Sequence, residues 1–364
     1  MELGVIYGLP DKYATTIRMK NLINSLSSDI KVKEVNLKNW EGGYPKKGFK
    51  VIKNTIQSLK KLKNSDVIYF NAPLLPSSFA GNLIKKIYSK PIIVDWDDAF
   101  IDFRKIKPSF FNPRAYYEYK SVKKANKLVV VSKYLRNVAL DIGVNNNDVS
   151  YISNGVDTDF FDPKKTKASK FIEKHQIDTQ KNTILFLGRI GGNKNEFAGK
   201  EVANATIKLL KEGKELEAMV VGDGPNLSNF KKYVSKMNCR ENFIFTGFIN
   251  RSNVRKAIKA SDICVNPLKE DNFSSRCRSS VKIKEYMSMA KKVVATGIGE
   301  NKRDLMYGEA GYLVEPGWRG IKKGLVKAME DEKSENEFAR KVAKKKFDWN
   351  VLSKKFHEII KRID

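Results

Sequence analysis

The chain has 364 residues, with 69 Lys or Arg residues against 41 Asp or Glu residues, and a formal net charge of +28. This length exceeds one ordinary domain and suits two. No apolar run reaches the ~18 residues that a membrane-spanning helix needs, so we expect none. Residues 1–7 are typical of a strand rather than of a signal peptide.

The net charge is the outlier of the composition. A field of this sign attracts polyanions such as nucleic acid, an anionic membrane or phosphorylated substrates. A solvated, Lys-rich surface accounts for the charge equally well. The three cysteines, Cys239, Cys264 and Cys277, share no metal-ligand spacing and cannot all pair with one another. We therefore expect reduced thiols in a cytoplasmic protein.

Strand-like and helix-like segments alternate along the first half of the chain. Short runs rich in Val and Ile fit strands that are buried on both faces, and apolar residues at helical spacing follow them. The predicted strands lie at 5–7, 67–70, 91–94 and 128–131. Alternation of this kind implies right-handed βαβ units and an α/β fold.

A break in this pattern predicts a domain boundary. Residues 154–163 hold turn formers and lead into a polar, Lys-rich stretch at 164–182. A second α/β series follows, with predicted strands at 184–187, 218–221, 243–245, 263–265 and 293–295. We predict two doubly wound domains, at 1–163 and 164–345. The carboxyl ends of their strands would face a shared cleft, because such sheets bind ligands there.

The first candidate site element follows the strand at 184–187. Gly188 and Arg189 end this strand, and Lys194 precedes a helix predicted to begin near Glu196. A strand end, a Gly-rich turn and a helix start form an anion site, because free N–H groups and the helix dipole point at it. Arg189 can fork onto phosphate oxygens, and Lys194 adds a point charge. Two solvated surface cations are the alternative interpretation.

Turns that contain glycine follow the next two strands. Gly222 and Gly224 lie in a Gly-Asp-Gly-Pro turn, where they permit close approach of the backbone to a ligand. Thr246 and Gly247 end the following strand and leave room for a nucleobase. Plain turns between strand and helix are the alternative in both places.

Residues 279–287 are predicted to be a loop that runs into a helix. Ser280 offers a hydroxyl group and a helix cap. Lys282 and Glu285 lie on one helix face, so both can reach the same ligand. A cation for the diphosphate and a carboxylate for the ribose hydroxyl groups suit a sugar nucleotide. The alternative is a surface ion pair that contributes about 0.3 kcal/mol.

An acidic cluster follows a predicted strand in the first half. It contains Asp95, Asp97 and Asp98, whose carboxylates we expect to project into the cleft. Clustered acids repel one another, which raises at least one pKa. They can orient an acceptor hydroxyl group, act as a base or hold a divalent cation, and helix capping is the alternative. Neither His175 nor His357 follows a predicted strand, so we do not expect a histidine-based mechanism.

The segment 100–117 mixes aromatic and cationic residues. This pattern is typical of an interfacial segment on an anionic bilayer. It also suits stacking on single-stranded nucleic acid. The alternative is a long loop whose aromatic side chains pack in the core.

The order of these motifs resembles that of the family 4 glycosyltransferases of the GT-B fold, the set called glycosyl transferases group 1. The similarity covers nearly the whole chain and is strongest from Leu128 to Pro316. Its motifs are Val131–Leu135, Ile152–Asp157, Gly188 with Arg189 and Lys194, Gly222–Pro225, Lys282–Met287 and Phe347–Trp349.

The resemblance implies two Rossmann-like domains and a last helix, at 346–364, that crosses back to the first domain. It also implies that Glu285 binds the ribose of the donor, and that the anomeric configuration is retained without a metal or other cofactor. The chain departs from the family where Cys277 replaces a frequent glutamate, for which Glu270 or Asp271 could substitute. It also has one glycine where the family often has two after the first strand, and no histidine near the acidic cluster.

These observations lead to the hypothesis of a glycosyltransferase in the cytoplasm or at the inner face of the cell membrane. It would move a sugar from a nucleoside diphosphate sugar to a glycan or lipid-linked acceptor. Arg189 and Lys194 would neutralise the departing diphosphate, and the acceptor would approach from the side of Asp97 and Asp98.

Two other classes of protein remain as alternatives. One is a different enzyme of the same fold, such as a sugar-nucleotide epimerase or a phosphorylase. The other is a nucleic-acid-binding protein, which the charge alone suggests. No zinc motif, RRM signature or basic repeat supports nucleic acid as a partner.

Overall fold

The computed structural model describes residues 1–11, 13–26, 28–37, 53, 55–99, 101–106, 108–109, 111–192 and 197–363. The chain forms two compact units. The first consists of Met1–Gly155, Asn272–Ser279 and Trp349–Asp364, and the second of Val156–Asp271 and Ser280–Asp348. None of the helices in the described ranges has the length and apolar character that crossing a bilayer requires.

These units differ in their bounds from the domains inferred from the sequence. The chain leaves the first unit after Gly155, inside the predicted first domain of residues 1–163. The segment Asn272–Ser279 falls within the predicted second domain but packs in the first unit.

The first unit is built on a parallel six-stranded sheet in the order β2-β1-β3-β4-β5-β6. Its central strands β3 and β4 are buried along their whole length, which is why their sequences are continuous apolar runs. The strands are β1 (Glu2–Tyr7), β2 (Lys31–Asn36), β3 (Val67–Asn71), β4 (Ile92–Trp96), β5 (Lys127–Val130) and β6 (Val149–Tyr151). The helices are α1 (Ala14–Ile23), α3 (Leu75–Tyr88), α4 (Pro113–Lys124), α5 (Lys133–Asp141), α10 (Phe273–Cys277) and α15 (Trp349–Lys361).

The second unit also has a parallel six-stranded sheet, in the order β12-β11-β10-β7-β8-β9. This is the strand order of a dinucleotide-binding fold, and it reverses between the neighbours β7 and β10. The strands are β7 (Asn182–Leu187), β8 (Leu216–Val221), β9 (Phe243–Gly247), β10 (Ile263–Asn266), β11 (Lys292–Thr296) and β12 (Tyr312–Val314). The helices are α6 (Ser169–His175), α7 (Lys200–Lys211), α8 (Leu227–Lys236), α9 (Arg251–Ala260), α11 (Val281–Ser288), α12 (Asn301–Asp304), α13 (Trp318–Glu330) and α14 (Glu337–Val342).

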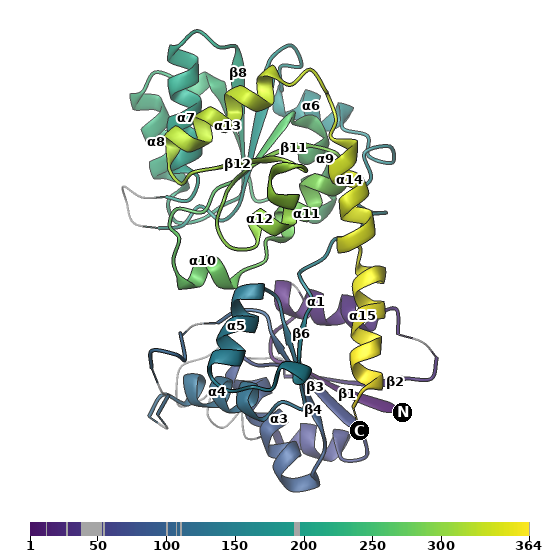
Figure 1. Cartoon of the computed structure of the whole chain (residues 1–364). Helices are drawn as coiled ribbons and strands as arrows, with labels where there is room; N and C mark the ends of the chain where they lie inside the picture. Colours follow the sequence, from purple (N-terminus) through teal and green to yellow (C-terminus); the bar gives the residue numbers. More distant parts are fainter. Residues whose placement is uncertain are drawn as a thin grey trace. The chain divides into compact units, whose positions relative to one another are not determined.

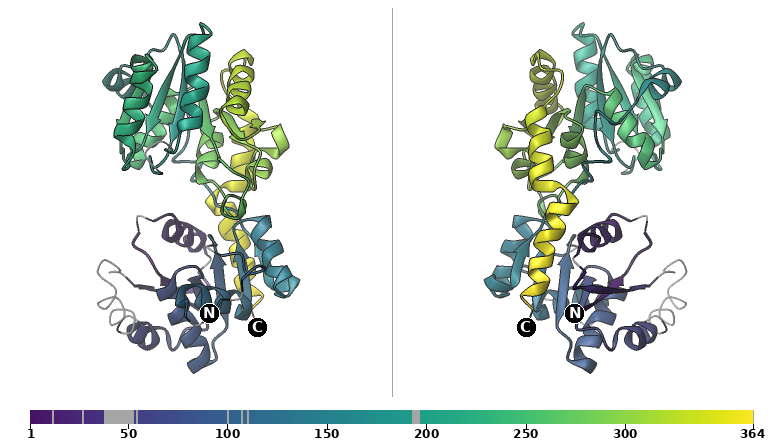
Figure 2. Two further views of the ribbon diagram at one scale, coloured as in Figure 1. Left: turned by 90° about the vertical axis from the view of Figure 1, so that its left-hand side faces the viewer. Right: turned by 90° about the vertical axis from the view of Figure 1, so that its right-hand side faces the viewer.

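In each unit the sheet is layered between helices (Figures 1 and 2), so the prediction of two doubly wound α/β domains is confirmed. The sequence does not predict β2, β6 and β12. All three are edge strands, and most of their residues are exposed or half-buried. An edge strand needs no continuous apolar run, so it leaves a weak signal in the sequence.

The last helix, α15, belongs to the first unit and packs against α1, as the resemblance implies (Figure 1). Its Phe356 is fully buried, with its ring centroid 4.6 Å from that of Tyr69 on β3. The hydroxyl group of Ser353 donates a hydrogen bond of 2.7 Å to the carbonyl oxygen of Leu22 at the end of α1. The helix is therefore part of the first hydrophobic core.

Phe356→Ala should lower the free energy of unfolding by about 3 kcal/mol or more, because it removes a buried ring and leaves a cavity. Urea unfolding followed by tryptophan fluorescence measures this, since Trp96 and Trp349 both lie in the first unit. Phe111→Ala is the matched control, because Phe111 is 97% exposed. Equal stability of both variants would show that α15 is not needed for the core.

Candidate functional site

In the second unit, the turns that follow β7 and β8 lie directly against each other at the carboxyl edge of the sheet. The amide of Gly188 donates to the carbonyl oxygen of Val221 at 2.9 Å, and the amide of Ile190 donates to that of Asp223 at 2.9 Å. The amide of Gly222 in turn reaches the carbonyl oxygen of Gly247 at 3.0 Å. The predicted glycine turns are thus brought together by backbone hydrogen bonds.

Gly222 and Gly224 have a local reason to be glycine. Both have positive φ values, 137° and 156°, which residues with side chains rarely adopt. A Cβ atom at Gly222 would lie 1.9 Å from the carbonyl oxygen of Gly188, and one at Gly224 would lie 2.4 Å from that of Ile190. The two glycines therefore allow one turn to contact the next, whatever further role a ligand gives them.

Helix α11 begins beside this edge and carries the predicted lysine and glutamate. The ammonium group of Lys282 donates to the carbonyl oxygen of Leu187, the last residue of β7, at 2.9 Å. The hydroxyl group of Ser280 contacts the side-chain oxygen of Asn266, the last residue of β10, at 3.2 Å. These contacts attach the start of α11 to the strand pair at which the order of the sheet reverses.

Glu285 is half-buried. Burial raises the pKa of its carboxyl group to about 7, although the positive charges of Arg251 and Lys282 oppose the rise. Sequence reasoning missed Arg251, which lies far from Glu285 along the chain. When the pKa of a carboxyl group lies near neutrality, a neighbouring positive charge or hydrogen-bond donor increases the fraction of the group that is charged at neutral pH.

Two further predicted residues of this edge stand apart from these contacts. Arg189 is exposed and makes no ion pair with the described residues. Lys194 lies outside the described residues. The helix expected near Glu196 is α7, and its first residue is Lys200. The prediction that Arg189 and Lys194 bind a diphosphate therefore stays a prediction.

At the end of β9, the hydroxyl group of Thr246 donates to the carbonyl oxygen of Gly247 at 2.9 Å. A Cβ atom at Gly247 would meet nothing within 4 Å, so the space beside this residue is open. The next residue, Phe248, is 80% exposed, which the alternation of strands and helices does not predict.

In the first unit, the structure corrects the expectation that the carboxylate of Asp95 projects into the cleft. Its side chain is buried and accepts hydrogen bonds from the guanidinium group of Arg18, at 3.0 and 3.2 Å, and from the hydroxyl group of Tyr69, at 2.8 Å. Arg18 also donates to the carbonyl oxygens of Ile152 and Ser153, both at 2.8 Å. A buried charge needs such a complete set of partners, so Asp95 has a structural role.

Asp97 and Asp98 remain as half-buried carboxyl groups next to this cluster. Burial raises the pKa of Asp97 to about 6; Asp95 and Asp98 add to the rise, whereas Arg18 and a 3.0 Å hydrogen bond from Thr15 oppose it. Burial also raises the pKa of Asp98, against the positive charges of Arg278 and Arg114. The expected rise is present, but burial contributes more to it than the mutual repulsion of the acids.

Cys277, which stands where the family often has a glutamate, is fully buried in the core of the first unit. Its neighbour Arg278 is exposed and lies 3.8 Å from the carboxylate of Asp98. Glu270 and Asp271 are exposed residues of the second unit.

The aromatic and basic segment at 100–117 divides into two parts. Phe103 is buried and stacks on Trp96, with ring centroids 5.8 Å apart. This agrees with the alternative interpretation, in which aromatic side chains of the loop pack in the core. Ile106 and Phe111 are 57% and 97% exposed. Phe100, Lys107 and Phe110 lie outside the described residues.

Two doubly wound sheets define a protein of the GT-B fold. The same fold is found in HepE of Anabaena, solved in complex with UDP, with a TM-score of 0.77 over 99% of both chains at 13% identity. Two family models match the chain: "Glycosyltransferase Family 4" over residues 29–160 and "Glycosyl transferases group 1" over residues 181–331. The chain belongs to the family 4 glycosyltransferases and transfers a sugar from a nucleotide sugar.

Two curated relatives are similar in sequence. An uncharacterised glycosyltransferase of Methanocaldococcus jannaschii is 27% identical over 81% of this chain and 73% of its own. An alpha-monoglucosyldiacylglycerol synthase of Streptococcus pneumoniae is 31% identical over 28% of this chain and 23% of its own.

Asp97→Asn should raise the free energy of unfolding at neutral pH by roughly 1 to 2 kcal/mol. This is less than the free energy that corresponds to the whole rise in the pKa of Asp97, because solvent screens a partly exposed group. In the folded chain the carboxyl group of Asp97 has a pKa of about 6, whereas its ordinary pKa is 3.8. Ionisation of Asp97 therefore costs stability as the pH rises through this window. Urea unfolding at several pH values should show the gain of the variant vanish below about pH 4. A gain that is constant with pH would contradict this prediction.

Proposed function

We propose that this glycosyltransferase takes its sugar from a nucleoside diphosphate sugar bound at the carboxyl ends of β7 and β10. It transfers the sugar, with retention at the anomeric carbon, to a glycan or lipid-linked acceptor. The observation that carries the proposal is the attachment of Ser280 and Lys282 to the ends of these two strands. Such a point of strand-order reversal is where doubly wound sheets bind nucleotides.

Each donor residue has a chemical role in this proposal. Glu285 accepts hydrogen bonds from the ribose hydroxyl groups, and the space beside Gly247 receives the base. The cations Arg189 and Lys194, at the turn that begins with Gly188, bind the diphosphate. Because negative charge grows on the diphosphate as it leaves, preorganised positive charge lowers the barrier to transfer.

In the first unit, Asp97 is the group proposed to meet the acceptor. With a pKa of about 6, its carboxyl group is mostly charged at neutral pH and can accept a hydrogen bond from a sugar hydroxyl group. Asp98, beside Arg278, is proposed to orient the same acceptor.

A membrane-borne acceptor is supported by the surface of the first unit and by one relative. Phe111 and Ile106 are exposed apolar residues, and Ile106 directly follows Arg104 and Lys105 in the sequence of a chain of net charge +28. Exposed apolar residues next to cations suit the surface of an anionic bilayer. The alpha-monoglucosyldiacylglycerol synthase, by its name, forms a glycolipid, which supports a lipid-linked acceptor here.

Thermal-shift measurements with UDP, GDP, ADP and dTDP should identify the donor nucleotide, because a ligand that binds only the folded state raises its stability. Arg189→Ala should abolish most of that shift. Arg240→Ala is the matched control, since Arg240 is also exposed but precedes β9, at the opposite edge of the same sheet. An equal shift in both variants would remove Arg189 from the site.

Flotation with lipid vesicles tests the membrane proposal. The chain should float with vesicles that contain anionic lipid and not with neutral ones, and Phe111→Ser should reduce flotation several-fold, about 0.8 kcal/mol being lost per buried methylene. Phe338→Ser is the control, because Phe338 is an exposed phenylalanine of the second unit. Absence of the chain from both kinds of vesicle would contradict a membrane-bound acceptor.

A further inference from the structure

Asn266, the last residue of β10, carries a buried amide group of which only one polar atom has a partner. The side chain is 4% exposed. Its oxygen accepts a hydrogen bond of 3.2 Å from the hydroxyl group of Ser280. Its nitrogen, Nδ2, has no hydrogen-bond partner among the residues that the structure describes. A buried donor without an acceptor costs free energy, so proteins retain few of them, mostly where a ligand or an ordered water supplies the acceptor.

This amide group lies where the strand order of the second sheet reverses. β10 and β7 pair in parallel up to their penultimate residues, so their last residues, Asn266 and Leu187, lie side by side. The carbonyl oxygen of Leu187 accepts the hydrogen bond from Lys282. A Cβ atom at Gly188 would lie 3.3 Å from the side-chain nitrogen of Lys282, so the ammonium group also lies beside the turn that follows β7. A cation and an amide donor therefore meet at the point where doubly wound sheets bind nucleotides.

The backbone around Asn266 is held in one position. Pro267 follows it, and a proline disfavours helical backbone in the residue before it. The amide of Leu268 donates a hydrogen bond of 2.8 Å to the hydroxyl group of Thr296, the last residue of β11. Because Ser280 holds the side-chain oxygen, the direction of the nitrogen is set before any ligand binds.

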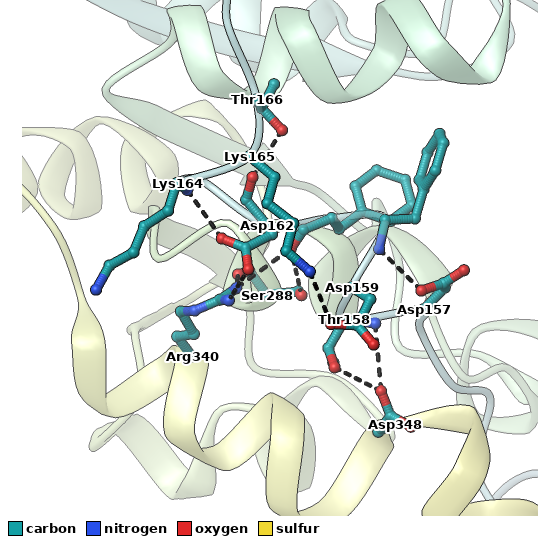
Figure 3. A network of polar contacts seen from close by, with 12 residues as sticks. Asp157, Thr158, Asp159, Asp162, Lys164, Lys165, Thr166, Ser288, Arg340 and Asp348 are labelled. Atoms are coloured by element: carbon teal, nitrogen blue, oxygen red, sulfur yellow. Dashed lines mark hydrogen bonds and ion pairs between the residues drawn. The ribbon is translucent and has the colours of Figure 1, made fainter.

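Helix α11, which begins directly after Ser280, is also fixed at its far end. The hydroxyl group of its last residue, Ser288, donates a hydrogen bond of 2.7 Å to the carbonyl oxygen of Phe161. Arg340 on α14 donates to the same oxygen at 3.3 Å and forms an ion pair of 2.9 Å with Asp162 (Figure 3). Because Arg340 and Asp162 are both buried, these contacts resist movement of α11 and of Ser280.

We propose that Asn266 binds the nucleoside diphosphate: its Nδ2 donates a hydrogen bond to a diphosphate oxygen beside the ammonium group of Lys282. A diphosphate has several charged oxygen atoms, so it can accept hydrogen bonds from the amide and the ammonium group together. The inference rests on the proposed function, which places this ligand at the ends of β7 and β10. An ordered water molecule is the alternative acceptor, and nucleotide affinity separates the two.

The unpartnered nitrogen predicts different effects on stability and on binding. In the free chain, Asn266→Leu removes a buried polar group that lacks a partner and keeps a side chain of similar shape, so the urea midpoint should stay the same or rise. Ser280 is half-buried, so its hydroxyl group can bond to water instead. When the ligand binds, the variant lacks a hydrogen bond to a charged group, so the affinity for the diphosphate should fall about tenfold or more.

Asn336→Leu is the matched control in the same unit. The side-chain oxygen of Asn336 accepts from the amide of Ala339 at 2.9 Å, and its nitrogen donates to the carbonyl oxygen of Ala310 at 3.2 Å. Both polar atoms thus have partners within the chain. Ala310 lies just before β12, so this amide group is at the opposite edge of the sheet. Asn336→Leu should lower the urea midpoint, because it removes a helix cap, and leave the nucleotide affinity unchanged.

Urea unfolding and isothermal titration calorimetry with UDP, GDP and ADP measure these effects. Asn266→Asp is a second variant, because it keeps an oxygen for Ser280 and replaces the nitrogen by a second oxygen. At about pH 8, where a carboxylate and the diphosphate are both charged, their repulsion should weaken binding more than Asn266→Leu does.

Three results would each overturn the inference. The first is an unchanged nucleotide affinity in Asn266→Leu. The second is a fall in its urea midpoint as large as that of Asn336→Leu, which would make the amide group a structural one. The third is an affinity of Asn266→Asp no lower than that of Asn266→Leu. Failure of the proposed function is distinguishable, because the unmodified chain would then bind none of the three nucleotides.

Discussion

The close approach of two backbone turns is the constraint on which the carboxyl edge of the second sheet depends. A Cβ atom at Gly222 would lie 1.9 Å from the carbonyl oxygen of Gly188, so only glycine permits this contact. The contact aligns the ends of β7 and β8, and the end of β7 in turn accepts the hydrogen bond from Lys282. A larger residue at 222 would displace the turn at 188 and, with it, the end of β7 to which Lys282 is hydrogen-bonded.

The ionisable groups fall into two classes with different physical roles. Arg18 with Asp95 and Lys284 with Asp304 are buried pairs whose charges are matched inside the core. Pairs of this kind stabilise a particular packing, because loss of either member leaves an unpaired buried charge. Asp97 and Glu285 differ: they are half-buried carboxyl groups with raised pKa values. Carboxyl groups of this kind are available to a ligand and respond to its binding.

Much of the fold and part of the site could be predicted from the sequence. The central strands are continuous apolar runs, so their positions and the α/β class follow from local pattern. The spacing of Lys282 and Glu285 places both on one face of a helix wherever that helix packs. The edge strands β2, β6 and β12 left no such run, because half of a partly exposed strand can be polar.

By itself, then, the sequence determined the α/β class, the family, and which glycines and charged residues end the strands, since these depend on neighbours along the chain. Only the tertiary structure decided which charges meet. It buries Asp95 with Arg18, places Arg251 on Phe160, and packs Cys277 in the core of the first unit. Each of these contacts joins residues far apart in the sequence, and burial, which sets their pKa values, depends on the packing of several elements at once.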